Sequence, residues 1–282
     1  MEQKECVIPF RKGGLGNQLF IVIAGYITSK VKNVPLYILN MHWQQHQKST
    51  GDYNKSIFAK LGIHIPVDQS NMSIIAPWYT LYSQDGFSPW SPDTIPACSF
   101  PDTYFQYYPA ILPYEEEVRE ILLKGLAPQR EILQSVYTGS YAFLHVRRGE
   151  YLPISHIHYV QPVEYFEKAV AHLDAQCILI FSDDTAWVEE QEFFKSERFQ
   201  IIRGLDELES LALMSLCTEG AICSNSTFSW WGAFLGAHGL RKKVIVPERW
   251  IDPNVFNTET WPTSPQGAKV PPLFPEEWII LS

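Results

Sequence analysis

The chain of 282 residues lacks several features that would assign it to a large class of proteins. No apolar run approaches the ~20 residues that a membrane-spanning helix requires. Met1–Cys6 is too acidic and too polar for a secretory signal peptide. Lys and Arg number 22 against 31 Asp and Glu, so the broad positive field that nucleic acid or an anionic membrane would need is missing. We expect a cytoplasmic protein, with peripheral contact to the inner face of a membrane as an open alternative.

Cysteine is scarce, and its spacing matches no metal or redox motif. The five cysteines are an odd number, contain no CxxC pair and lie mostly in or near apolar segments. We interpret them as reduced and mostly buried. The neighbouring carboxylates of Asp183 and Asp184 have no third ligand nearby in the sequence, so we expect no metal site and no cofactor.

Hydrophobic residues make up 46% of the chain, which is enough for a substantial core. From residue 141 onward, short apolar runs alternate with segments of helical periodicity. This alternation predicts a parallel sheet covered on both faces. The expected strands span 141–146, 177–181, 199–202, 221–223 and 244–247, and the expected helices span 162–173, 185–195, 206–217 and 227–236.

The first half opens with the pattern of an α/β unit. The sequence predicts a strand at Cys6–Phe10, a glycine-rich loop, a helix over Asn17–Lys32 and a strand at Pro35–Asn40. Periodicity is weak over residues 41–110, and two helices are expected at 114–124 and 129–137. We predict an N-terminal domain over 1–138 and a C-terminal domain over 139–282, whose proline-rich tail packs back on the first.

The most informative motif is His145-Val-Arg-Arg-Gly-Glu-Tyr151, which follows an apolar strand. Alternation along the strand places His145 and Arg147 on one face and Val146 on the other. Two arginines at a strand end suit a phosphate or diphosphate, because the guanidinium group stays charged and presents a fork of donors. A salt bridge to Glu150 or another carboxylate is the alternative. The adjacent Gly149 favours the anion site, since it allows close backbone approach.

Three other segments would converge with this motif if each lies at the carboxyl end of a strand. Ser224–Thr227 precedes a helix, whose N-terminus attracts anions, and capping alone needs only one of these four polar residues. One carboxylate of Asp183-Asp184 is expected to cap the following helix. Gly13–Phe20 is neither GxGxxG nor a P-loop, so by itself it predicts a simple turn.

Together these segments resemble the glycosyltransferase family 11 α-1,2-fucosyltransferases, which carry GGLGNQLF, HVRRGDY and SNSTFSWWGA in this order. Tyr104–Gln106 and Val244–Trp250 are lesser agreements, and residues 47–100 contribute little. The resemblance implies an α/β fold of GT-B architecture, with two Rossmann-like domains facing across a cleft. It also implies metal-independent transfer of L-fucose, with inversion, from GDP-fucose to the 2-hydroxyl of a terminal galactose in an oligosaccharide or glycan.

The resemblance assigns roles to individual residues. Arg147 would stabilise the leaving diphosphate, Asn17 would reach the sugar, and Glu150 is the first candidate for the base, with His156 and His158 as alternatives. The residues implied to bind the donor are Gly14, Gly16, Gln18, His145, Arg148, Asp183, Glu209, Asn225, Ser226, Thr227 and Phe228.

Two positions depart from the family pattern. Glu150 replaces the aspartate of HVRRGD, and Ser210, beside Glu209, stands where relatives carry an aspartate for guanine. Two alternatives also stay open. One is a GDP-sugar transferase that forms another linkage, such as α-1,6. The other is a non-catalytic carbohydrate-binding protein, for which the aromatic residues would suffice.

Overall fold

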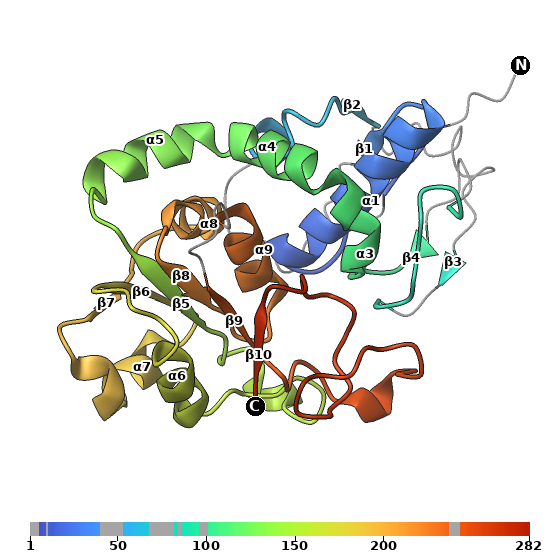
Figure 1. Ribbon diagram of the computed structural model, residues 1–282. Coiled ribbons are helices and arrows are strands. Elements are labelled where there is room, and N and C mark those ends of the chain that lie inside the picture. The colour runs from blue at the N-terminus through green and yellow to red at the C-terminus, as the bar shows by residue number, and fades with distance from the viewer. Residues whose placement is uncertain are drawn as a thin grey trace, which may run out of the picture. The chain divides into compact units, whose positions relative to one another are not determined.

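A computed structural model describes residues 6–9, 11–39, 53–67, 82–83, 86–95, 101–236 and 243–282. The chain divides into two compact units, Met1–Gly125 and Leu126–Ser282 (Figure 1). Among the described helices, none is both long and apolar enough to cross a membrane.

The second unit is built on a six-stranded parallel sheet with the order β10-β9-β8-β5-β6-β7. The chain runs from β5 outward to β6 and β7, and then returns to the other side of β5 for β8, β9 and β10. The direction therefore reverses between β5 and β8, which is the place where open α/β sheets bind ligands. The strands are β5 (Ala142–Val146), β6 (Ile178–Ser182), β7 (Phe199–Ile201), β8 (Gly220–Ile222), β9 (Val244–Pro247) and β10 (Ile279–Leu281).

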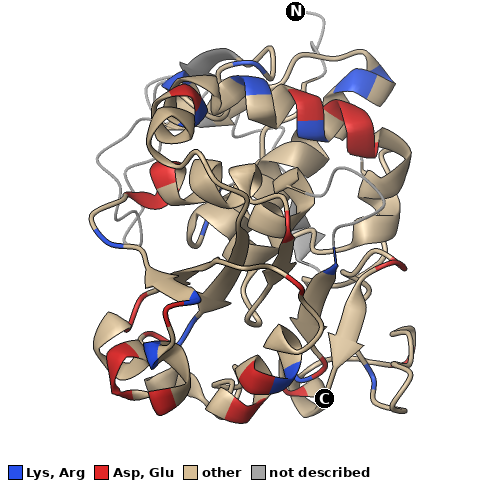
Figure 2. Cartoon of the chain, turned by 60° about the vertical axis from the view of Figure 1, so that its left-hand side comes forward, with Lys and Arg blue, Asp and Glu red and all other residues tan. Residues whose placement is uncertain are grey.

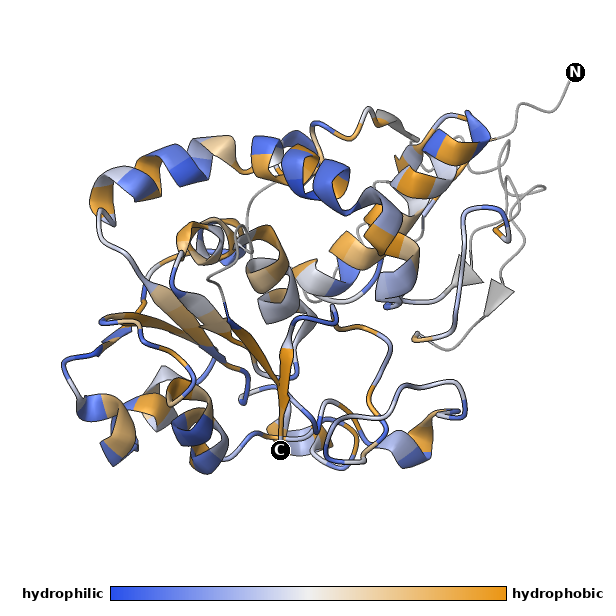
Figure 3. Ribbon diagram, viewed as in Figure 1, coloured by the Kyte–Doolittle hydropathy of each residue, from blue (hydrophilic) through white to orange (hydrophobic). Residues whose placement is uncertain are grey.

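Helices cover both faces of this sheet, as the sequence predicts (Figure 1). The strands contain no charged residue (Figure 2), and their apolar side chains form the core (Figure 3). Leu144 and Val146 pack with Phe166 on one face, and Val146 lies on the opposite face from His145. One face carries α6 (Val163–Val170), α7 (Thr185–Glu190) and the 3-10 helix Glu192–Lys195, and the other carries α5 (Ala127–Val136), α8 (Glu207–Leu216) and α9 (Thr227–Gly236).

Three features of this unit differ from the sequence-based expectation. The helix expected over 185–195 is divided into α7 and a 3-10 helix at Gln191, whose backbone is extended. The edge strand β10 was not predicted. Helix α5 packs against α8 in the second unit, whereas the boundary expected after residue 138 assigned it to the first. The tail is held to its own unit, because the indole Nε1 of Trp230 donates to the carbonyl of Leu273 at 2.9 Å.

The first unit contains the β-α-β opening in reduced form. Val7 forms a parallel bridge with Leu36, so the strand expected at Cys6–Phe10 is only a bridge in the described residues. Helix α1 (Leu15–Lys32) ends at Asn33, whose left-handed backbone closes the helix. The strands β1 (Tyr37–Leu39) and β2 (His64–Val67) pair in parallel, as do β3 (Tyr82–Ser83) and β4 (Pro101–Asp102), and the helices α3 (Tyr108–Ile111) and α4 (Glu115–Gly125) complete the unit. Much of the weakly patterned region 41–110 lies outside the described residues.

Candidate functional site

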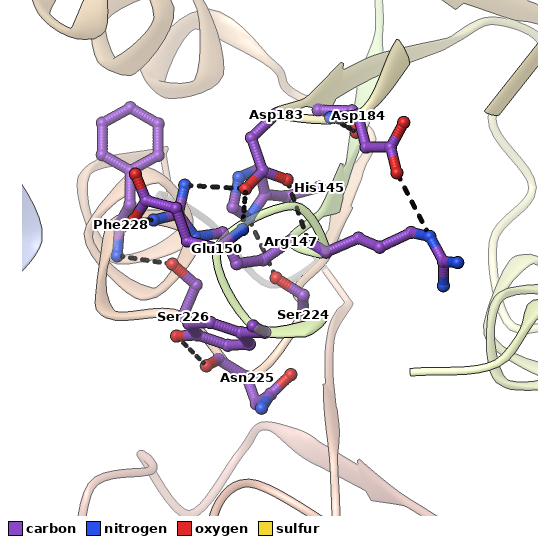
Figure 4. A network of polar contacts seen from close by, with 12 residues as sticks. His145, Arg147, Glu150, Asp183, Asp184, Ser224, Asn225, Ser226 and Phe228 are labelled. Atoms are coloured by element: carbon purple, nitrogen blue, oxygen red, sulfur yellow. Dashed lines mark hydrogen bonds and ion pairs between the residues drawn. The ribbon is translucent and has the colours of Figure 1, made fainter. Parts of the chain in front are cut away.

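The loops at the carboxyl ends of β5, β6 and β8 are joined by side-chain contacts (Figure 4). The imidazole Nδ1 of His145, at the end of β5, lies 3.0 Å from the hydroxyl of Ser224, which follows β8. The backbone N–H of Arg148 donates to the carboxylate of Asp183, which follows β6, at 2.8 Å. Three of the four segments singled out in the sequence therefore meet at the switch point of the sheet.

Arg147 lies between two carboxylates of different exposure. Its guanidinium is 3.1 Å from Asp183 Oδ2, contacts Glu150 Oε2 and lies over the ring of Tyr151. The Asp183 side chain is only 11% exposed, whereas the Glu150 side chain is 48% exposed. A Cβ at Gly149 would lie 3.3 Å from Asp183 Oδ2, so glycine permits the close approach of this loop. An anion entering from solvent would therefore displace Glu150 more readily than Asp183.

Asp183 is held as a carboxylate by its surroundings. Burial alone would raise its pKa, but the Arg147 charge and the backbone N–H groups of Arg148 and Gly149 outweigh burial and lower the pKa. His145 is affected in the same direction, because burial lowers its pKa to about 3, assisted by Arg147 and opposed by Asp183. The His145 ring is therefore neutral near pH 7, and it lies 5.8 Å from the Phe228 ring, centroid to centroid.

Arg148 turns away from Arg147 and toward α7. Its Nε is 3.2 Å from Asp184 Oδ2, and its guanidinium stacks over Trp187 at 4.8 Å from the ring centroid. The Asp184 carboxylate also accepts from the N–H of Trp187 at 3.1 Å, which caps α7. The prediction that one of the two aspartates caps this helix is confirmed. The guanidinium of Arg148, a residue that the resemblance implies to bind the donor, contacts Asp184 and Trp187.

The turn from β8 into α9 is neutral and internally bonded. The hydroxyl of Ser226 accepts from the N–H of Phe228 at 3.3 Å, so Ser226 caps the helix. The Ser229 hydroxyl donates to the carbonyls of Ser224 and Ser226. Thr227 is the first residue of α9, whose positive dipole end faces the ends of β5 and β8.

Asn225 uses its side chain for bonds within the protein. Its Nδ2 donates to the carbonyls of Tyr159 at 2.8 Å and Trp250 at 2.9 Å, and its Oδ1 accepts from Gln161 Nε2 at 3.3 Å. Asn225 is 2% exposed, and Figure 4 shows its side chain pointing away from His145. These contacts occupy both N–H donors of the Asn225 amide, a residue that the resemblance implies to bind the donor.

Three side chains that our sequence reasoning missed hold the same turn. The hydroxyl of Tyr165, on α6, donates to the carbonyl of Cys223 at 2.6 Å, and the hydroxyl of Tyr151 donates to the carbonyl of Asn225 at 3.0 Å. Gln161 adds a bond to the Arg249 carbonyl at 2.7 Å. Burial raises the pKa of Tyr151 to about 12. Tyr151 ends the arginine motif, which was a signal available from sequence, whereas Gln161 and Tyr165 carry no such signal.

The site residues predicted in the first unit lie in the loop before α1 and in its first turn, where side-chain hydrogen bonds hold them. Gly13 has a left-handed backbone (φ 72°), and its carbonyl accepts from Gln18 Nε2 at 2.9 Å. Gln18 is 1% exposed, Gly16 is buried in α1, and Gly14 is the N-cap of α1. The Oδ1 of Asn17 accepts from Gln106 Nε2 at 3.1 Å.

Glu209 closes a capping box at the start of α8. Its carboxylate accepts from the N–H of Asp206 at 2.9 Å, while the Asp206 carboxylate accepts from the N–H of Glu209. The Glu209 side chain therefore stabilises the helix on which Ser210 lies. Among the residues described here, no three His, Cys, Asp or Glu side chains gather as a metal site would require.

Comparison with known proteins finds two relatives from Escherichia coli. The O-antigen biosynthesis glycosyltransferase WbnK is 37% identical over 122 residues, which is 39% of this chain and 39% of the relative. An alpha-1,2-colitosyltransferase is 25% identical over 162 residues, which is 52% of this chain and 54% of the relative. The aligned segments thus span about half or less of the length of these relatives.

The fold is similar to that of Arabidopsis thaliana FUT1, solved as the mutant R284K in complex with GDP. The TM-score is 0.52 at 12% identity, and the match covers 90% of this chain and 73% of that one. This likeness confirms the α/β fold of GT-B type. The sequence model of glycosyl transferase family 11 matches residues 44–259, which include both the arginine motif and the Ser224–Thr227 turn. The chain belongs to glycosyltransferase family 11.

Proposed function

We propose that this protein transfers L-fucose from GDP-fucose to the 2-hydroxyl of a terminal galactose, with inversion and without a metal ion. The observation that carries the proposal is that the loop bearing Arg147 is joined to the turn leading into α9, through the His145–Ser224 and Tyr151–Asn225 contacts, at the switch point between β5 and β8. A fixed cation and a helix N-terminus together suit a sugar nucleotide's diphosphate. Membership of family 11 supports the chemistry.

Transfer breaks the bond between the sugar carbon and the diphosphate oxygen, and the electron pair leaves with GDP. The barrier falls when positive groups stabilise the charge that develops on that oxygen. Arg147 supplies such a charge at a half-buried position, and the α9 dipole adds to it. The acceptor hydroxyl attacks the opposite face of the sugar carbon and gives its proton to a base.

Glu150 is the base that the geometry supports best. It is the exposed partner of Arg147, and a diphosphate that bound Arg147 would release this carboxylate to accept a proton. His158 is a weaker alternative, because its ring is stacked on Tyr151 at 4.6 Å and burial, assisted by Arg147, lowers its pKa. His156 is exposed in the same loop.

On the nucleoside, we propose that the neutral, buried ring of His145 and the half-buried ring of Phe228 provide a contact surface. The Glu209 side chain is engaged in its capping box, so guanine reading by this helix would fall to Ser210. Asn17, with Oδ1 fixed by Gln106, is proposed to reach the sugar. We also propose that the protein works in the cytoplasm.

Colitose transfer is the second candidate, because one relative is named as a colitosyltransferase. Both candidates are tested by incubating the protein with GDP-fucose, or with the corresponding colitose donor, and a panel of galactosides, and by determining the product linkage by NMR. An α-1,2-fucosyl product is the expected result. An α-1,6 product would overturn the linkage. Carbohydrate binding without GDP release in any mixture would overturn the enzymatic function.

A further inference from the structure

Asn225 lies in the Ser224–Thr227 turn, which is proposed to bind the diphosphate. Its side chain, however, forms hydrogen bonds to other parts of the protein. We define the Asn225 latch as the Asn225 side chain and its three partners, the Tyr159 carbonyl, the Trp250 carbonyl and Gln161 Nε2. Both N–H donors of the amide are bonded, and so is its oxygen. The latch therefore joins the turn after β8 to the loop after β5 and to the loop after β9.

The latch is not explained by the needs of helix α9. Ser226 already caps the helix, and Ser229 already satisfies the carbonyls of the turn. Two other bonds hold the same segment from outside, and a third links Gln161 to the loop after β9. Tyr165 binds the carbonyl of Cys223, Tyr151 binds the carbonyl of Asn225, and Gln161 binds the loop after β9.

We propose that Asn225 is a positioning residue, which fixes the backbone of the Ser224–Thr227 turn for the diphosphate and does not itself touch the nucleotide. This inference rests on the proposed function. A buried amide whose two donors face two carbonyls holds three segments in one geometry, and a carboxylate in its place would put an acceptor against acceptors. A side chain that touched the nucleotide would instead have to leave the latch.

The experiment compares the dissociation constants of GDP and GMP by calorimetry in the full chain. The ratio isolates the part of binding that depends on the diphosphate, so a general loss of stability does not change it. The variants are Asn225→Asp, which is isosteric, Gln161→Leu, which removes one partner of the latch, and Tyr151→Phe, which removes the separate bond to the backbone carbonyl of Asn225. The last two loosen the turn without altering Asn225. The control is Asn257→Asp, the same chemical change at an exposed residue.

We expect Asn225→Asp to reduce the advantage of GDP over GMP by about tenfold or more, since two bonds become repulsive contacts. Gln161→Leu and Tyr151→Phe should each reduce it by about two- to fivefold, and Asn257→Asp should leave it unchanged. If Asn225→Asp did not fold, the other two variants would decide the outcome alone.

Three results would overturn the proposal that Asn225 positions the turn for the diphosphate. An unchanged ratio in all variants would show that the latch does not act on the diphosphate. A reduced ratio in Asn225→Asp but not in Gln161→Leu or Tyr151→Phe would show that the added negative charge, and not the geometry of the turn, weakens diphosphate binding. Wild-type protein that bound neither nucleotide would remove the proposed function and the latch with it, whereas GDP binding with an unchanged ratio would remove the latch alone.

Discussion

The loop after β5 and the turn after β8 lie side by side at one edge of the sheet, but they are built on opposite principles. The loop after β5 is charged, and its arginines are held by the carboxylates of Asp183, Glu150 and Asp184. The turn after β8 has no charged residue between Cys223 and Thr227, and hydrogen bonds to its backbone hold it in place. The loop after β5 supplies charge, and the turn after β8 supplies a backbone held in one conformation.

The difference has a physical reason. An exposed ion pair such as Arg147–Glu150 contributes little to stability and can exchange partners when a stronger anion arrives. A buried amide such as that of Asn225 cannot exchange partners without leaving polar groups unsatisfied. The charged loop is therefore suited to bind and release a ligand, and the neutral turn is suited to stay unchanged while that happens.

Arg147→Ala has the largest expected effect on activity. Loss of the cation should lower the turnover of GDP-fucose more than about a hundredfold, since no other residue supplies this charge to the leaving group in the proposed mechanism. A GDP-release assay measures the effect, and circular dichroism checks the fold. Arg203→Ala, which removes an exposed arginine paired with Glu189, is the control. Retention of most of the rate would reject the role of Arg147.

Glu150→Gln tests whether the exposed partner of Arg147 is more than a counterion. We expect turnover to fall about a hundredfold with GDP affinity changed less than about threefold, because a general base acts after binding. Kinetics and calorimetry on one preparation separate the two quantities. If donor binding weakened as much as turnover, Glu150 would position Arg147 instead.

The pH dependence of the free energy of unfolding should report on two titratable groups of this region, His145 and Asp183. The folded pKa of His145 is lowered to about 3, so the unfolded chain takes up a proton first and stability falls as the pH drops below about 6.5. Asp183, whose folded pKa is also lowered, adds a further loss below about 3.9. Urea unfolding between pH 7 and 4 should give a flatter profile for His145→Gln than for wild type. Equal slopes in wild type and His145→Gln would contradict the assignment.

Arg148→Ala should have the smallest effect. The side chain stacks on Trp187 and pairs with Asp184 away from Arg147, so its loss should cost about 1 kcal/mol of unfolding free energy and change turnover only a few-fold. Denaturant unfolding and the GDP-release assay measure both. A loss of activity comparable to that of Arg147→Ala would place the two arginines in one functional unit.

The sequence predicted where the segments meet better than where their side chains point. Buried parallel strands such as β5 and β6 are continuous apolar runs, and the carboxyl ends of neighbouring strands share one edge, so the meeting of His145, Asp183 and Ser224 followed from the pattern. The orientation of Asn225 did not follow, because its partners are backbone carbonyls at Tyr159 and Trp250, which no side-chain pattern reveals.

The short strand at the edge of the six-stranded sheet could not be predicted from the sequence either. Strand β10 is three half-buried residues, too few to show an alternation.

The place of α5 was missed for a different reason. A helix between two domains is assigned by what it packs against, and the contact of α5 with α8 is not visible in the periodicity of either helix.

The order of the strands has a consequence for the synthesis of the protein. Because β8 joins β5 only after β6 and β7 have been made, and because Asn225 binds the carbonyl of Trp250, the site is complete only when the chain has emerged past β9. A nascent or truncated chain that ends before Trp250 would contain both arginines and the whole turn, yet lack one of the bonds that fix the turn. Nucleotide binding by ribosome-bound chains of increasing length would therefore mark the moment at which the turn after β8 is fixed.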